Sequence, residues 1–174
     1  WQISKEPPIV YKTLDLIEEH KKWLSPVRIG AGTKKTAAHA LIKFPGSQKA
    51  SVEEAKRMMK DAIDFINHVY GGDAVFAARV DRDEKGQRNV DVFFAPRYTK
   101  ETKRGLGDRW FSITHFNKEL CKRHAPEIIR RSPKGKYSDG GRSVGMSLQS
   151  ELAAFMAERG WEARPKNEKA NFGP

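Results

Sequence analysis

Residues 74–96 read Ala74-Val-Phe-Ala-Ala-Arg-Val-Asp-Arg-Asp-Glu-Lys-Gly-Gln-Arg-Asn-Val-Asp-Val-Phe-Phe-Ala-Pro96, and this stretch decides the fold. Two runs of β-branched, aromatic and small apolar residues flank a short polar segment that contains Gly86. This is the local pattern of two antiparallel strands joined by a turn. The sequence therefore predicts a β-hairpin at the centre of the chain, with polar side chains gathered at its turn.

The polar side chains of this hairpin share one face only if the loop has an odd number of residues. Side chains alternate between the faces of a strand, so pairing Asp81 with Asp91 gathers the set, whereas an even loop scatters it. Converging carboxylate and amide oxygens suit a hard divalent cation such as Mg²⁺ or Mn²⁺. The alternative is a solvated turn, because turns attract such residues for backbone reasons. The set comprises Asp81, Asp83, Asn89 and Asp91.

The composition describes one soluble globular domain with a polyanionic partner. Of its 174 residues, 38% are hydrophobic and 32% charged. No apolar run approaches the ~20 residues of a membrane-spanning helix, so no membrane partner is expected. The net charge of +11 is spread over many segments instead of one amphipathic helix, which favours nucleic acid over a membrane surface. The single Cys121 has no disulfide partner, so we expect a reducing compartment, the cytoplasm.

The flanking sequence alternates helical and strand patterns, which predicts an α+β fold. Helices are expected over residues 13–23, from a Ser51 capping box to Gly71-Gly72, from about Phe116 to before Pro126, and from about Leu148 to Gly160. Strands are expected at residues 9–13 and, as a core strand, at 36–44. Basic loops are expected at 27–35, 97–107 and 130–142, with a short strand or helix entry at 110–115. Residues 1–165 form one domain, and residues 166–174 a linker or tail.

Most of the excess positive charge lies in one segment. Residues 97–142 carry 13 Lys and Arg against 5 Asp and Glu, with Tyr98, Trp110 and Tyr137 among them. Single-stranded bases stack on aromatic rings while cations hold the phosphates, so this mixture predicts a single-stranded nucleic-acid surface; a solvated basic loop is the alternative. The candidate DNA-binding residues are Arg97, Tyr98, Lys100, Lys103, Arg104, Arg109, Trp110, Arg130, Arg131, Lys134, Lys136 and Arg142.

The order of these pieces resembles the Mob/Pre family of plasmid mobilisation relaxases and plasmid recombination enzymes. The resemblance rests on a Pro45-Gly46 turn, a helix ending in Tyr70-Gly71, Asp81-x-Asp83-Glu84 followed by Asn89-x-Asp91, and Gly160-Trp161 after a Leu148-Gln149 helix. It covers about residues 36–165. It implies a two-layer α+β fold in which helices pack on a central antiparallel sheet, the relaxase-like architecture.

In that family three histidines hold a divalent cation that polarises the scissile phosphate of single-stranded DNA. Here Asp81, Asn89 and Asp91 stand at the histidine positions, Glu84 matches the motif's glutamate as a catalytic candidate, and a Thr-Pro pair is absent. Oxygen donors in place of imidazoles would favour Mg²⁺ or Mn²⁺.

The family's nucleophile comes from the N-terminal region, where His20 lacks the expected His-Asn-x-Arg context. The candidates are therefore His20, Tyr11 and Tyr98, each of which would have to reach the metal-bound phosphate. Two functions follow from the resemblance. One is a relaxase that nicks single-stranded or hairpin DNA of a plasmid or mobile element beside other mobilisation proteins. The other is a DNA-binding module of the same fold without cleavage. A structural or protein-interaction domain is a third class.

Overall fold

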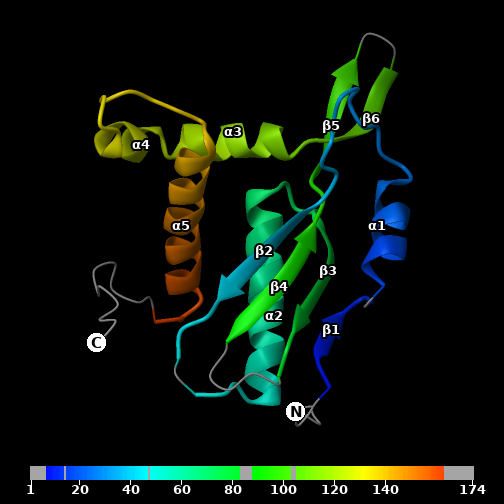
Figure 1. The fold of residues 1–174 in the computed structure, drawn as a ribbon, viewed down its shortest axis with the longest axis vertical. Coiled ribbons are helices and arrows are strands. Elements are labelled where there is room, and N and C mark those ends of the chain that lie inside the picture. Colours follow the sequence, from blue (N-terminus) through cyan, green and yellow to red (C-terminus); the bar gives the residue numbers. More distant parts are fainter. Residues whose placement is uncertain (1–6, 14, 47, 83–87, 103–104, 163–174) are drawn as a thin grey trace.

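The structure is a computed structural model, in which residues 7–13, 15–46, 48–82, 88–102 and 105–162 are described (Figure 1). It confirms the α+β class. The elements follow along the chain in the order β1 (Ile9–Tyr11), α1 (Leu16–Leu24), β2 (Ala38–Lys43), α2 (Val52–Val69), β3 (Val75–Val80), β4 (Asn89–Phe94), β5 (Arg97–Thr102), β6 (Gly105–Phe111), α3 (Ile113–Arg123), α4 (Ala125–Arg131) and α5 (Gly141–Glu158).

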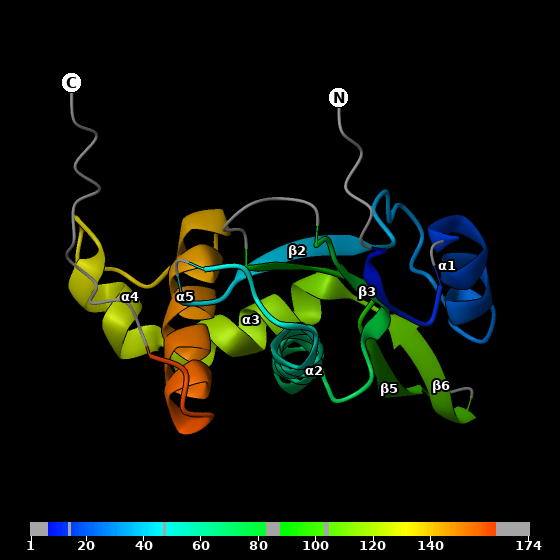
Figure 2. The ribbon, with the colours of Figure 1, turned by 90° about the horizontal axis from the view of Figure 1, so that it is seen from below.

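Four strands form one antiparallel sheet in the order β1-β3-β4-β2. The predicted hairpin supplies its two central strands, β3 and β4. Helix α2 packs along one face, so the sheet and this helix make two layers (Figure 2). β2, predicted as a core strand, is instead an edge strand. Its side chains alternate between core and solvent, with Ile42 buried and Leu41 59% exposed, because α2 covers only one of its faces.

The main core lies between α2 and the covered face of the sheet. In β4 the side chains of Val90, Val92 and Phe94 point into this core, while the alternate residues point to the opposite face. α2 begins at the predicted cap, where Ser51 Oγ accepts a hydrogen bond from the Glu54 backbone N–H at 3.1 Å. Local capping and periodicity therefore place both elements correctly.

A smaller apolar cluster lies on the opposite face, under α1. Phe76, Ala77, Ala95 and Phe111 are buried there against Trp23 and its neighbours on α1. α1 thus covers one end of this face. The remainder, which carries Leu41 and the polar side chains of β3 and β4, is the open face of the sheet.

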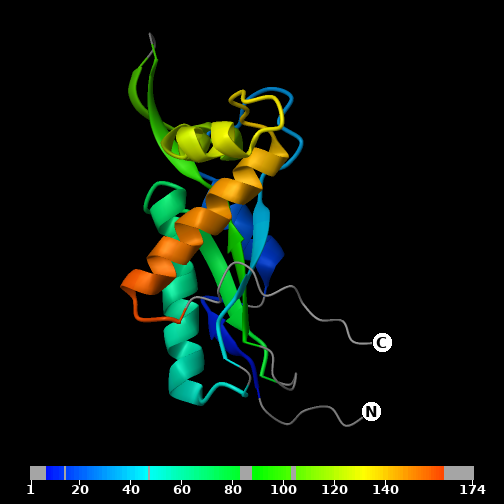
Figure 3. The same cartoon turned by 90° about the vertical axis from the view of Figure 1, so that its left-hand side faces the viewer.

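β5 and β6 form a two-stranded antiparallel ribbon that projects beyond the rest of the chain (Figures 1 and 3). The prediction of a loop over residues 97–107 is therefore wrong. The segment lacks the apolar alternation of a half-buried strand, so its pairing has no local hydrophobic signal. Its base is held from outside: Arg28 N–H donates to Arg109 O at 2.8 Å, and Phe111 N–H donates to Arg28 O at 3.0 Å.

Helix α3 runs across the end of the molecule, and α5 returns beside the β2 edge (Figure 1). Between them lies α4, which the sequence reading missed although Pro126 sits in its first turn, where proline is tolerated. The predicted loop over residues 130–142 is correspondingly shorter. Arg130 and Arg131 belong to α4, and Arg142 to the first turn of α5.

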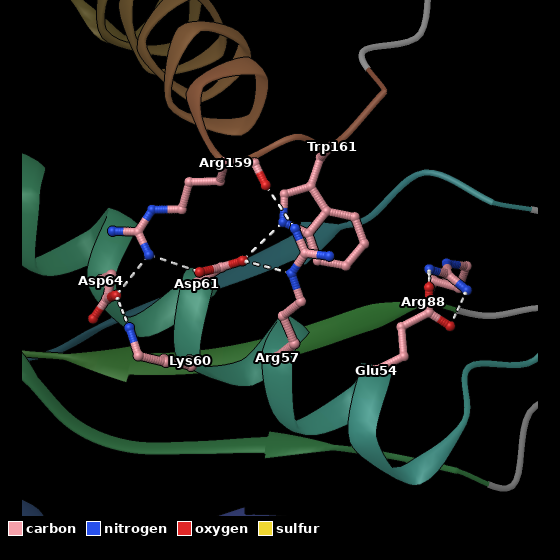
Figure 4. Close-up of polar contacts among 8 residues, drawn as sticks. All are labelled: Glu54, Arg57, Lys60, Asp61, Asp64, Arg88, Arg159 and Trp161. Atoms are coloured by element: carbon pink, nitrogen blue, oxygen red, sulfur yellow. Dashed lines mark hydrogen bonds and ion pairs between the residues drawn. The ribbon is translucent and has the colours of Figure 1, made fainter.

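The buried carboxylate of Asp61 on α2 joins that helix to the end of α5 (Figure 4). Its oxygens accept from Trp161 Nε1 at 2.8 Å and from Arg159 Nη1 at 2.7 Å. Arg57 lies over the Trp161 ring, 4.3 Å from its centroid, and donates to Arg159 O at 2.6 Å. Arg159 also pairs with Asp64 at 2.9 Å. We call these five residues the Asp61 clasp.

A second polar junction joins α2, α3 and α5 through Glu151. Its two oxygens lie 2.9 Å from His68 Nε2 and 2.6 Å from His124 Nε2, and Arg123 pairs with it at 3.4 Å. Burial raises the pKa of the Glu151 carboxyl, but the hydrogen bonds from His124 and His68 outweigh it and leave the pKa below its usual value. His68 on α2 thus holds α5 through this carboxylate.

Candidate functional site

Two of the polar residues of the β3–β4 hairpin, Asp81 and Asp91, meet Arg79 on the open face of the sheet. Arg79 is the direct cross-strand partner of Asp91, and the eleven residues 80–90 connect them. This odd number is the condition under which the polar side chains of the two strands share one face. The expected pairing of Asp81 with Asp91 is wrong by two residues. The register depends on how β4 packs against β2 and α2, and the residues of the turn do not indicate that packing.

Arg79 lies between the two carboxylates that were predicted as metal ligands. Its Nη2 is 3.3 Å from Asp81 Oδ2, and its Nε is 3.4 Å from Asp91 Oδ2. The other oxygen of Asp91 accepts from His39 Nε2 at 2.6 Å. The His39 ring in turn stacks on Phe93, with centroids 4.8 Å apart. The open face therefore carries a linear array of acid, guanidinium, acid and imidazole.

The described side chains do not fit a divalent cation at this place. Among the residues that the structure describes, no group of three or more His, Cys, Asp and Glu side chains is placed to hold a metal ion. Three of the four oxygens of Asp81 and Asp91 face Arg79 or His39, so the guanidinium is the counter-ion of these acids. Asn89 begins β4 across from Lys43. Asp83 and Glu84 lie outside the described residues.

The three candidate nucleophiles do not meet these carboxylates. Tyr11 pairs with Ala78 and packs into the main core, on the face opposite to Asp91. His20 donates from Nε2 to Thr36 O at 3.0 Å, and its ring lies 5.3 Å from that of Phe76. These contacts place His20 at the junction of α1 with β3 and with the segment that leads into β2. Tyr98 lies on the separate ribbon.

The ribbon gathers aromatic and basic side chains. Tyr98 and Trp110 are cross-strand partners, and Lys100 Nζ lies 5.6 Å from the Trp110 ring centroid. The Tyr98 ring stacks on exposed His115 of α3, with centroids 4.4 Å apart and an interplanar angle of 12°. Arg109 is also exposed. Lys103 and Arg104 lie outside the described residues.

Arg97 differs from the other predicted DNA contacts, because its side chain is only 10% exposed. It pairs with Asp73, donates to Trp23 O at 3.3 Å and lies over the Trp23 ring at 3.7 Å. These contacts join the base of the ribbon to α1. Arg97 is therefore a structural cation, and its prediction as a free phosphate ligand is not supported by this geometry.

A pocket of about 350 Å³ opens at the base of the ribbon, and we call it the ribbon pocket. It forms where the turn after α2, the ribbon and the start of α3 meet. It is lined by Gly71, Asp73, Arg97, Tyr98, Thr99, Arg109 and Phe116.

The second basic group lies at the other end of α3 from the ribbon (Figures 1 and 2). It spans the end of α4, the connection to α5 and the first turn of α5, and all its members are exposed. Arg131 pairs with Glu127 at 3.0 Å, so part of its charge is neutralised locally. The group consists of Arg130, Arg131, Lys134, Lys136 and Arg142.

Three residues of these sites were missed from the sequence. His39 lies in the strand expected at 36–44, Arg79 in the first apolar run of the hairpin and His115 in the segment 110–115, and none of them is among the candidates. The alternation in β2 and β4 places His39 and Asp91 on one face only once the strands are paired. His115 gains its role from a stack with a residue 17 positions earlier, which periodicity does not reveal.

The fold and sites define a two-layer α+β protein with a projecting basic ribbon. Compared with protein-family models, curated proteins and solved structures, the chain matches none of them. The likeness to the Mob/Pre family thus remains a prediction from motif order. No helix in the described part of the chain is both long and apolar enough to cross a membrane.

Proposed function

We propose that this chain is a DNA-binding domain of the relaxase type, which holds single-stranded or hairpin DNA of a plasmid or mobile element in the cytoplasm. The proposal rests on one observation above all: the ribbon presents the Tyr98–His115 stack beside exposed Arg109. Aromatic faces take unstacked bases irrespective of sequence, and cations take the phosphates between them. Mobilisation proteins of the same replicon are the expected protein partners.

The charge distribution supports the same function. The +11 net charge attracts a polyanion over long range. Two basic surfaces flank α3, one on the ribbon and one at the α4–α5 connection, so a strand running along this end of the molecule would meet both (Figure 1). Arg79 offsets one of the two negative charges of Asp81 and Asp91, so the open face repels the strand less than a bare acidic site would.

Fluorescence anisotropy tests the binding. A labelled 20-nucleotide single strand, a hairpin with a single-stranded arm and a blunt duplex are titrated with the protein from low to physiological salt. We expect the first two to bind more tightly than the duplex, with a log-log salt slope of about −0.7 per phosphate contact. No binding of any of the three at low salt would refute the proposal and favour a protein-interaction domain.

Metal-assisted nicking is the second candidate function. The observation that favours it is that Asp81, Asp91 and His39 share one face. A cation could use these donors only if Arg79 left them, so we expect wild type to form no covalent adduct with an origin oligonucleotide in Mg²⁺ or Mn²⁺. Arg79→Met frees the acids, and Mn²⁺ binding by this variant is then measured calorimetrically. A wild-type adduct that Asp91→Ala abolishes would establish nicking instead.

A further inference from the structure

The ribbon pocket has the size of a small-ligand site, and aromatic rings form part of its wall. Its volume of about 350 Å³ falls at the lower end of the range for ligand pockets, ~300–1,000 Å³, which admits one nucleotide-sized group. Gly71, at φ +90°, allows Phe116 to close one side, because a Cβ there would lie 2.7 Å from the Phe116 ring. The rings of Phe116 and Tyr98 meet at 89°, with centroids 6.3 Å apart. Tyr98 is thus held by Phe116 and by the stacked His115 before any ligand arrives.

The charges of the pocket select an anion. Arg97 is neutralised by its pairing with Asp73. Arg109 lies across the ribbon from Thr99, and among the described residues no hydrogen bond or ion pair engages its guanidinium. Among the side chains that the structure describes, the pocket therefore offers the Arg109 guanidinium as a cation beside an aromatic wall. A lone phosphate would use only the cation, and an apolar ligand only the wall.

We propose that the ribbon pocket binds one nucleotide of the bound single strand, whose base packs against Tyr98 and whose phosphate pairs with Arg109. This inference rests on the proposed DNA-binding function and assigns it a specific subsite. A guanidinium and a phosphate form a bidentate, charge-assisted contact, and the preset Tyr98 ring loses little freedom when a base packs on it. The ribbon then positions the strand instead of only attracting it.

Photo-crosslinking with a 20-nucleotide strand containing 5-iododeoxyuridine tests the placement, and anisotropy measures the affinity. Variants are Tyr98→Leu, Tyr98→Phe and Arg109→Gln. Lys56→Gln near the opposite end of α2 is the control, since it removes the same charge as Arg109→Gln from an exposed site. Circular dichroism and thermal melting verify that each variant folds.

We expect the wild-type crosslink to map to Tyr98 or its immediate neighbours. Loss of the stacking ring in Tyr98→Leu should weaken binding roughly 5- to 150-fold, whereas Tyr98→Phe retains most of the affinity. Arg109→Gln should reduce the salt slope by about 0.7, the value for one phosphate on a single strand, and Lys56→Gln should reduce it less.

Two outcomes separate the subsite from the wider function. If wild type binds single strands but Tyr98→Leu and Arg109→Gln bind like Lys56→Gln and the crosslinks map elsewhere, the subsite is refuted and DNA binding stands. If wild type binds no single strand at low salt, both fail together.

Discussion

Replacement of Asp61 by asparagine tests whether the Asp61 clasp holds the end of α5 against α2. The side chain of Asp61 is 6% exposed, and its two oxygens serve different donors, Trp161 Nε1 and Arg159 Nη1. Asn keeps the shape but loses the charge, and its NH₂ group must face one of these donors. One buried N–H is then left without an acceptor.

The cost follows from burial. Removing one partner of a fully buried ion pair costs ~3–5 kcal/mol, and an unsatisfied buried donor costs ~1–3 kcal/mol. Arg159 is one-third exposed and recovers part of its hydration, which discounts the first figure. We therefore expect Asp61→Asn to lower the free energy of unfolding by about 2–4 kcal/mol. For a chain of this length the melting temperature should fall by roughly 5–15 °C.

Urea unfolding followed by circular dichroism and tryptophan fluorescence measures this loss. Asp64→Asn is the matched control, because Asp64 pairs with the same Arg159 from the next turn of α2. Its side chain is one-third exposed, so we expect a loss of at most about 1 kcal/mol. Equal destabilisation by the two variants would refute the assignment of the buried carboxylate as the centre of the clasp.

Two further predictions concern other parts of the fold. Gly71→Ala should destabilise the protein by about 1–3 kcal/mol more than Gly72→Ala. Both glycines have a positive φ, but only at Gly71 does the new Cβ meet the Phe116 ring. Equal melting temperatures of the two variants would contradict this prediction. The pKa of Glu151 is depressed in the folded protein, so this carboxylate stabilises the fold above the ordinary pKa of 4.5, and the stabilisation is lost as the pH falls through the folded pKa. Glu151→Gln should therefore flatten the acid limb of a plot of urea midpoint against pH. An unchanged acid limb would contradict this assignment.

Local signals predicted the elements whose formation is itself local. The Ser51 cap and the helical spacing of α2 were found in the sequence, as was the β3–β4 hairpin, because capping and alternation involve residues within a few positions of one another. The ribbon and α4 were missed for the complementary reason. The backbone of Arg28, some 80 residues earlier in the chain, forms hydrogen bonds with the ribbon, and α4 packs through its buried Ile128.

The same division holds for the sites. The sequence showed which acids lie near the turn of the hairpin. For any loop with an odd number of residues, these acids lie on the same face of the sheet. It did not show the register, which pairs Arg79 with Asp91 and places the guanidinium beside that carboxylate. Nor did it show His39 on the neighbouring strand.

By itself, therefore, the sequence determined the α+β class, the central hairpin, the cap of α2 and the basic character of residues 97–142. Only the tertiary structure decided that Arg79 pairs with both acids and that Tyr98 stacks on His115 at the edge of a pocket. The physical reason is the range of the interactions. Periodicity and capping act within one element, whereas register, counter-ions and ring stacks depend on which distant elements pack together.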